Sequence, residues 1–148
     1  MKKIFLALSL LPIICFAQDH VSEFWKIDFW RSNQVINAQS TEFYLTHAED
    51  KEKNTLYGNS IIFQKDGTFV SQYRADCGYD CFPSSKGTFK KIDDNHIHLR
   101  INSFEQHGEI RICPPIDDHT QRDLGIFKIE PTKEGYHLIK SPLSNSNP

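Results

Sequence analysis

Short runs of alternating apolar and polar residues, separated by turn residues, dominate this chain. In the run at 96–101, Ile97, Leu99 and Ile101 alternate with polar residues and face one side of a predicted strand. The same pattern predicts about eight short strands along the chain. They span residues 24–30, 56–64, 68–73, 87–92, 96–101, 109–113, 124–130 and 136–140.

Turn residues connect these runs in pairs. Asp66 and Gly67 separate two apolar runs, which is a strong hairpin signal, and the segments 93–95 and 131–135 separate two further pairs. Because half of each run is polar, one face of the sheet is solvated, as in antiparallel sheets. The predicted fold class is therefore all-β: an antiparallel arrangement of about eight strands, as a β-sandwich or a small barrel.

Only the segment from Ser40 to Lys53 fits a helix, with Ser40 or Thr41 as its cap. Residues 43–45 fit a strand equally well, so this segment is predicted as irregular or as one short helix. The pattern leaves the structure of 31–54 open. The polar tail at 144–148 lacks apolar anchors and is predicted to be disordered, which leaves 18–143 as a single domain.

The first seventeen residues have the pattern of a cleavable signal peptide. Two lysines precede an apolar run, and small residues at Cys15 and Ala17 predict cleavage before Gln18. The bulky Ile13 and Ile14 disfavour lipidation at Cys15. The run is shorter than the roughly 20 residues of a membrane-spanning helix. We expect an exported protein, periplasmic or secreted, with no membrane anchor.

Charge excludes some partners and leaves others open. The chain has 17 basic and 19 acidic residues, and Lys2 and Lys3 leave with the signal peptide, so the mature balance is 15 − 19 = −4. A mildly acidic chain without a basic patch is not expected to bind nucleic acid or anionic lipid. The oligomeric state does not follow from the sequence.

Several segments together resemble the small exported lipocalin-like proteins of bacteria. They are Trp25 in the first predicted strand, the hairpin at 61–69, the run at 87–89 and the turn and strand at 93–99. The resemblance covers residues 24–140, although Glu23 stands where the lipocalin signature has Gly two residues before the tryptophan. It implies a lipocalin-like barrel with a binding role and no named ligand.

Three cysteines remain after signal cleavage: Cys77, Cys81 and Cys113. In an oxidising compartment close cysteines form disulfides. If the strands form a meander, the strand at 109–113 ends at the far rim from Cys77, which predicts a Cys77–Cys81 bond and leaves Cys113 unpaired. A crossed connection would reverse this choice, so the state of Cys113 stays open. The Cys-x-x-x-Cys spacing differs from that of thiol oxidoreductases and zinc ribbons.

No catalytic motif is recognisable, so we expect no enzyme and no cofactor. The sharpest chemical feature is His96 and His98, which share one strand face and could bind a metal if His107 or His137 approached. That face lies opposite the apolar one, so we interpret His96 and His98 as solvent-exposed surface residues and predict no metal site. The carboxylates at 93–94 and 117–118 are read as turn and loop residues.

Most aromatic residues are expected in the core. Trp25 and Trp30 fall on opposite faces of one predicted strand, so one of them faces outward and contacts either a covering segment or a ligand. Tyr79 and Phe82 lie on the cysteine loop and are the other candidates for an exposed contact.

Three hypotheses of function follow. The first is a non-enzymatic binding protein for a small apolar ligand, with the binding residues unknown; an open apolar cavity inside the barrel would favour it. The second is an inhibitor or interaction module that presents the Cys77–Cys81 loop to a protein target, favoured by a filled barrel with an ordered loop. The third is a metal binder that uses His96 and His98.

Overall fold

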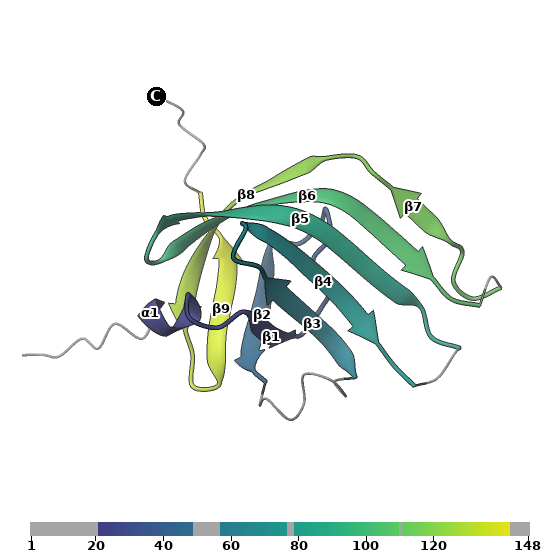
Figure 1. Ribbon diagram of the computed structural model, residues 1–148, viewed down its shortest axis with the longest axis horizontal. Helices are drawn as coiled ribbons and strands as arrows, with labels where there is room; N and C mark the ends of the chain where they lie inside the picture. Colours follow the sequence, from purple (N-terminus) through teal and green to yellow (C-terminus); the bar gives the residue numbers. More distant parts are fainter. Residues whose placement is uncertain (1–20, 49–56, 77–78, 110, 143–148) are drawn as a thin grey trace, which may run out of the picture.

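The computed structural model describes residues 21–48, 57–76, 79–109 and 111–142 of the 148-residue chain. One short helix precedes the strands (Figure 1). The elements are α1 (Val21–Phe24), β1 (Phe29–Ser32), β2 (Glu42–His47), β3 (Gly58–Phe63), β4 (Thr68–Arg74), β5 (Phe82–Asp93), β6 (His96–His107), β7 (Ile116–Asp118), β8 (Arg122–Pro131) and β9 (Gly135–Lys140). The predicted signal peptide at 1–17 and the predicted tail at 144–148 lie outside the described residues.

The strands form a closed antiparallel barrel. Their order in the nine-stranded sheet is β5-β4-β3-β1-β2-β9-β8-β6-β7, and pairing of β5 with β6 closes it. Eight strands make the barrel, while β7 pairs with β6 beyond the stretch that β8 occupies. The predicted all-β class with an eight-stranded antiparallel barrel is therefore confirmed.

The order departs from a simple meander at β1. This strand pairs with both β2 and β3, so that β2 lies between β1 and β9. The prediction of an irregular or helical segment at 40–53 was wrong for β2. Phe43 and Leu45 are buried there and alternate with exposed Glu42 and Tyr44, which is the period of a strand.

The first strand begins later than predicted. The four-residue helix α1 and a turn take up the start of the segment 24–30, with Ile27 N–H donating to the Phe24 carbonyl oxygen. Trp30 lies on β1 and points into the core, whereas Trp25 precedes the strand. In the described part of the chain, no helix has the length and apolar character needed to cross a membrane.

Side chains fill the interior of the barrel. Alternate residues of nearly every strand point inward and are buried, as the period of a strand requires. Phe24 is 2 % exposed and covers one end of this core. At the other end Ile36, in the β1–β2 connection, is fully buried, and its N–H donates to Ser71 Oγ at 3.0 Å. Apolar residues thus cover both ends of the barrel.

β5 and β6 form a long ribbon that runs past the rest of the barrel (Figure 1). Each has twelve residues, about twice the length predicted for them. Gly87, where the predicted strand at 87–92 began, lies inside β5 at a register shift. A side chain at this position would collide with the Arg100 carbonyl oxygen and the Phe69 ring. Glycine here permits close strand approach and does not end the strand.

The disulfide joins Cys81 to Cys113, whose Cα atoms are 5.4 Å apart. The predicted Cys77–Cys81 bond and the free Cys113 were therefore wrong; Cys77 itself lies outside the described residues. The error came from the predicted strand at 109–113. β6 extends to His107, which pairs with Phe82, and a turn then places Cys113 beside Cys81. We call this end of the barrel, opposite α1, the stapled end.

Candidate functional site

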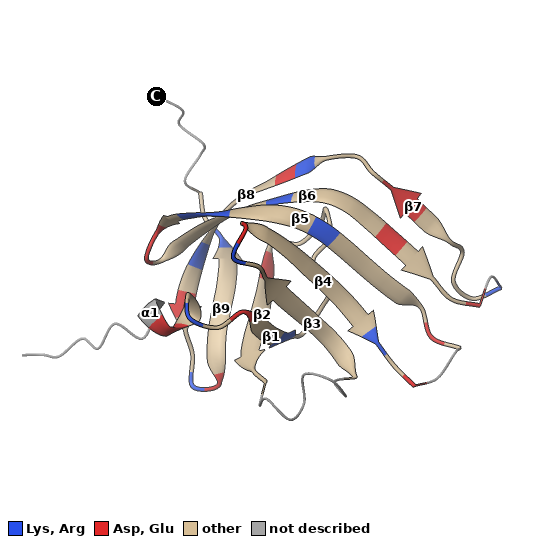
Figure 2. Ribbon diagram, viewed as in Figure 1, with Lys and Arg blue, Asp and Glu red and all other residues tan. Residues whose placement is uncertain are grey.

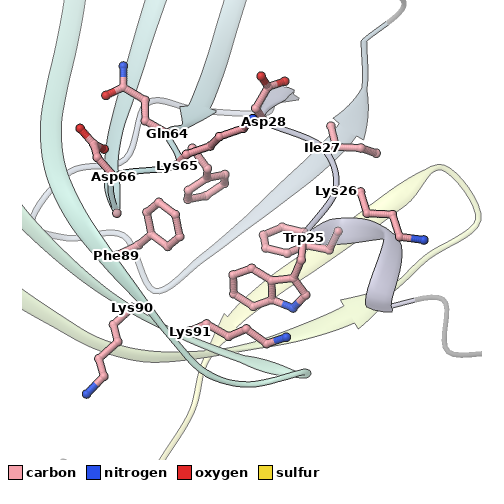
Figure 3. A pocket seen from close by; sticks show the side chains of 13 residues that line it. Trp25, Lys26, Ile27, Asp28, Gln64, Lys65, Asp66, Phe89, Lys90 and Lys91 are labelled. Carbon is pink, nitrogen blue, oxygen red and sulfur yellow. The ribbon is translucent and has the colours of Figure 1, made fainter.

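The candidate site is a solvent-open pocket of about 680 Å³ at the end of the barrel that α1 covers. Three separate segments form it: the α1–β1 connection, the β3–β4 turn and the outer half of β5 (Figure 3). We call it the rim pocket. Its lining residues are Phe24, Trp25, Lys26, Ile27, Asp28, Phe63, Gln64, Lys65, Asp66, Gly67, Phe89, Lys90 and Lys91.

Four aromatic rings form the inner wall of the rim pocket. Phe24 contacts Trp25 edge-on with ring centroids 5.0 Å apart, and it lies 5.7 Å from Phe63. Phe63 in turn meets Phe89 at 5.1 Å in a T-shaped contact. Phe24 and Phe63 are buried, while Trp25 and Phe89 are only partly buried. The two partly buried rings are therefore the surfaces that a ligand in this pocket would contact first.

The position of Trp25 is fixed by contacts with the β5–β6 turn. Its indole N–H donates to the Asp94 carbonyl oxygen at 3.0 Å. Lys91 Nζ lies 5.0 Å from the centroid of the Trp25 ring and also pairs with the Asp94 carboxylate at 2.6 Å. These contacts hold the ring edge in place and leave the ring partly open to solvent. The ring is thus a preformed part of the wall.

Charged residues surround the aromatic wall. Four lysines and two aspartates line the rim pocket, so its lining carries a net positive charge. Hydrogen bonds from the Thr68 hydroxyl and N–H lower the pKa of Asp66, which keeps this carboxylate charged within the β3–β4 turn. Figure 2 shows acidic and basic residues interspersed around this end of the barrel. A pocket with an aromatic wall and more lysines than aspartates in its lining suits a molecule with an apolar body and an anionic group.

The two histidines singled out in the sequence lie on the outer face of β6, each beside a carboxylate. His96 Nδ1 lies 2.9 Å from Asp93, and His98 Nε2 lies 2.6 Å from Asp123. His107 and His137 do not join them, since their partners are Glu105 at 3.8 Å and Glu42 at 3.0 Å. Within the described ranges no group of three histidine, cysteine or acidic side chains is arranged to hold a metal ion.

The carboxylates beside these histidines should make the stability of the fold depend on pH in the acidic range. The hydrogen bond with His96 is the largest influence that lowers the pKa of Asp93. For Asp123 burial acts in the opposite direction, but contacts with His98, the Gly125 N–H and Arg100 together lower its pKa. A lowered pKa in the folded state means that the charged form stabilises the fold. This stabilisation is present above about pH 4 and is lost as the pH falls through the folded-state pKa.

We therefore expect Asp123→Asn to destabilise the protein near neutral pH by less than about 1 kcal/mol, because the pair is partly exposed. The difference from the wild type should shrink as the pH is lowered from 6 to 3. Chemical denaturation at several pH values measures it. Asp117→Asn, which changes a carboxylate that is 74 % exposed, serves as the control. A difference that grows on acidification would contradict the assigned sign.

The stapled end exposes apolar side chains beside the disulfide. Tyr79 is 71 % exposed and Ile112 is 61 % exposed, and each lies within two residues of a bonded cysteine. Phe82 is partly buried and contacts Tyr73 with ring centroids 6.2 Å apart. Of the two aromatic candidates on the cysteine loop, Tyr79 is thus on the surface and Phe82 belongs to the β5 packing.

The sequence pattern pointed to only one residue of the rim pocket. Trp25 was one of two candidates for an outward-facing tryptophan, and it is the one at the pocket. Phe63, Phe89 and the lysines were missed as site residues, because each looks like an ordinary strand or turn residue in sequence. Only the closure of the barrel brings their three segments together.

No family model, curated protein or solved structure matches this chain. The eight-stranded antiparallel barrel is compatible with the resemblance to lipocalin-like proteins, and the agreement is one of architecture.

Proposed function

We propose that the protein is an exported, non-enzymatic binding protein that holds a small apolar molecule with an anionic group in the rim pocket. One observation carries the proposal: the partly exposed rings of Trp25 and Phe89 line a pocket whose lining also includes four lysines and two aspartates. The ligand lies at the barrel end in this proposal, because side chains fill the interior. The pocket volume is within the range typical of small-molecule sites.

The disulfide supports the proposed export of the protein. A Cys81–Cys113 bond is compatible with an oxidising compartment, where structural disulfides form and persist. Together with the signal-peptide pattern at 1–17, it favours a periplasmic or secreted protein.

A titration with decanoate tests the ligand class, with decanol as an uncharged probe of equal chain length. We expect Lys65→Gln/Lys91→Gln to weaken decanoate binding about tenfold, since two charge contacts near the surface are lost. Decanol binding should weaken less than decanoate binding; some loss is expected because Lys91 also contacts the Trp25 ring of the pocket wall. Raising the salt concentration should weaken binding of decanoate but not of decanol, because salt screens exposed charges. Isothermal titration calorimetry measures both probes.

The matched control is Lys86→Gln/Lys128→Gln, which removes the same charge from exposed lysines outside the pocket. It should leave the affinity for decanoate nearly unchanged. Equal weakening by the two double variants would mean that net charge and not the rim pocket governs binding. Failure of wild-type protein to bind decanoate saturably would refute the proposed ligand class.

A second candidate function is a protein-interaction module that presents the stapled end. The exposed Tyr79 and Ile112 beside the disulfide favour it, since a cross-linked edge loses little conformational entropy on binding. Substitution of Tyr79 and Ile112 by serine would abolish capture of a protein target while leaving decanoate binding intact. Under the rim-pocket proposal the same variant keeps the function of the protein in its host, because ligand binding at the rim pocket does not use Tyr79 or Ile112.

A further inference from the structure

A polar groove of about 360 Å³ lies on the wall of the barrel that β1, β2 and β3 form. It shares no lining residue with the rim pocket. We call it the tyrosine groove. Its lining residues are Arg31, Ser32, Asn33, Tyr44, Thr46, Tyr57, Gly58 and Asn59.

Two exposed tyrosines border this groove. Tyr44 is 46 % exposed and Tyr57 is 54 % exposed. Tyr44 projects from the outer face of β2, because it alternates with the buried Phe43 and Leu45. Tyr57 directly precedes β3, and the strand order is β3-β1-β2, so the two tyrosines reach the groove from opposite neighbours of β1. Both rings are open to a molecule in the groove.

Contacts on the far side of each tyrosine hold the two rings in position. His137 of β9 stacks on Tyr44 with ring centroids 4.2 Å apart and an interplanar angle of 4°. Because β2 lies between β9 and β1, the other face of the Tyr44 ring is directed to β1 and the groove. The Tyr57 hydroxyl donates to Asp76 Oδ1 at 2.5 Å. Rings that are already held in place lose little conformational entropy when a ligand binds.

Two asparagines supply polar groups whose orientation is fixed by the backbone. Asn33 Oδ1 accepts a hydrogen bond from the Tyr44 N–H at 2.8 Å, which leaves Asn33 Nδ2 as a donor. Asn59 Nδ2 donates to the Asn33 carbonyl oxygen at 3.2 Å, which leaves Asn59 Oδ1 as an acceptor. Asn33 is exposed and Asn59 is partly exposed. A donor and an acceptor on neighbouring residues match sugar hydroxyls, since each hydroxyl both donates and accepts.

The charge of the groove favours a neutral ligand. No lysine, aspartate or glutamate is present among the described residues that line it. Arg31 is the charged residue in this lining, and it already takes part in an interaction within the chain. The other polar groups are the hydroxyls, amides and phenols of neutral side chains. The tyrosine groove thus differs from the rim pocket, where lysines predominate.

We propose that the tyrosine groove binds a neutral saccharide. The C–H face of a sugar ring packs on Tyr44 and Tyr57, since the faces of aromatic rings carry negative charge density. The hydroxyl groups at the edge of the sugar bond with Asn33 and Asn59. A purely apolar ligand would cover these amides without pairing them and bind less well. This site is independent of anion binding in the rim pocket.

A printed array of neutral and acidic glycans tests the proposal on the wild-type protein and on Tyr44→Ala/Tyr57→Ala. We expect the wild type to bind neutral glycans and the double variant to bind them about tenfold more weakly, because two stacking contacts are lost. The matched control is Tyr79→Ala, which removes a tyrosine that is 71 % exposed at the stapled end. It should bind like the wild type. Decanoate binding should be equal in all three proteins, so failure of either site is seen separately.

A chemical-shift titration of the wild-type protein gives a second measurement that does not depend on the folding of a variant. The probe is the neutral glycan with the strongest signal on the array. We expect saturable changes at the side-chain NH2 signals of Asn33 and Asn59 and at the backbone signal of Tyr44. Absence of binding to every neutral glycan, a preference for acidic glycans, or full binding by the folded double variant would overturn the proposal. Shifts concentrated outside the groove would overturn it as well.

Discussion

Replacement of both Cys81 and Cys113 by serine is expected to lower the free energy of unfolding by about 3–4 kcal/mol. The bond links residues 32 positions apart, and closing a loop of that size restricts the unfolded chain by about this amount. It also fixes the connections at the stapled end, where the β4–β5 segment meets the β6–β7 turn. Urea denaturation of the wild type and the double variant measures the difference.

Cys77→Ser is the matched control for this experiment. Because Cys81 is bonded to Cys113, the control should keep the stability of the wild type and the disulfide. Peptide mapping under non-reducing conditions should recover Cys81 linked to Cys113. A large loss of stability in Cys77→Ser, or a peptide in which Cys77 is linked to Cys81, would contradict the pairing.

Phe24→Ala is expected to cost about 3–5 kcal/mol, the range for deleting a buried phenylalanine ring. Phe24 is 2 % exposed and is the centre of an aromatic cluster. Its ring lies within 5.7 Å of the rings of Trp25, Trp30, Phe63 and Tyr136, measured between centroids. The ring joins α1 to the barrel core and lines the rim pocket, so its loss should also disrupt the wall of that pocket. Thermal and chemical unfolding measure the change.

Two controls bracket this prediction. Phe24→Leu retains most of the buried apolar volume and should cost much less than the alanine variant. Tyr79→Ala removes an exposed aromatic side chain and should change stability by less than about 0.5 kcal/mol. A Phe24→Ala protein as stable as Tyr79→Ala would show that α1 does not pack on the barrel end as described.

Alternation predicted the strands that have one solvated and one buried face. In β6 the buried Ile97, Leu99 and Ile101 occupy the positions that the pattern indicated. The Asp-Gly step also marks the observed turn between β3 and β4, where Gly67 has a positive φ of 84°. These features are local, because the period of a strand and the chemistry of a turn depend on neighbouring residues.

Pairing between strands that are distant in sequence could not be predicted from the local pattern. In sequence the segment that contains β2 fitted a short helix or a strand equally well, and its identity as a strand follows from pairing with β1 and β9. The lengths of β5 and β6 depend on their long mutual register, so the predicted start of β5 was too late and the predicted end of β6 too early. That error moved Cys113 to the wrong end of the barrel and led to the wrong disulfide. The rim pocket was missed for the same reason, since three distant segments form it.

The central claim is that the rim pocket binds an amphipathic anion through Trp25, Phe89 and the surrounding lysines. The most direct test is a map of backbone and indole chemical shifts during a decanoate titration of the wild-type protein. The account predicts saturable changes concentrated on Trp25, Lys65 and Phe89. Changes concentrated at Tyr79 and Ile112, on the stapled end, would contradict it and would place the binding surface at the opposite end of the barrel.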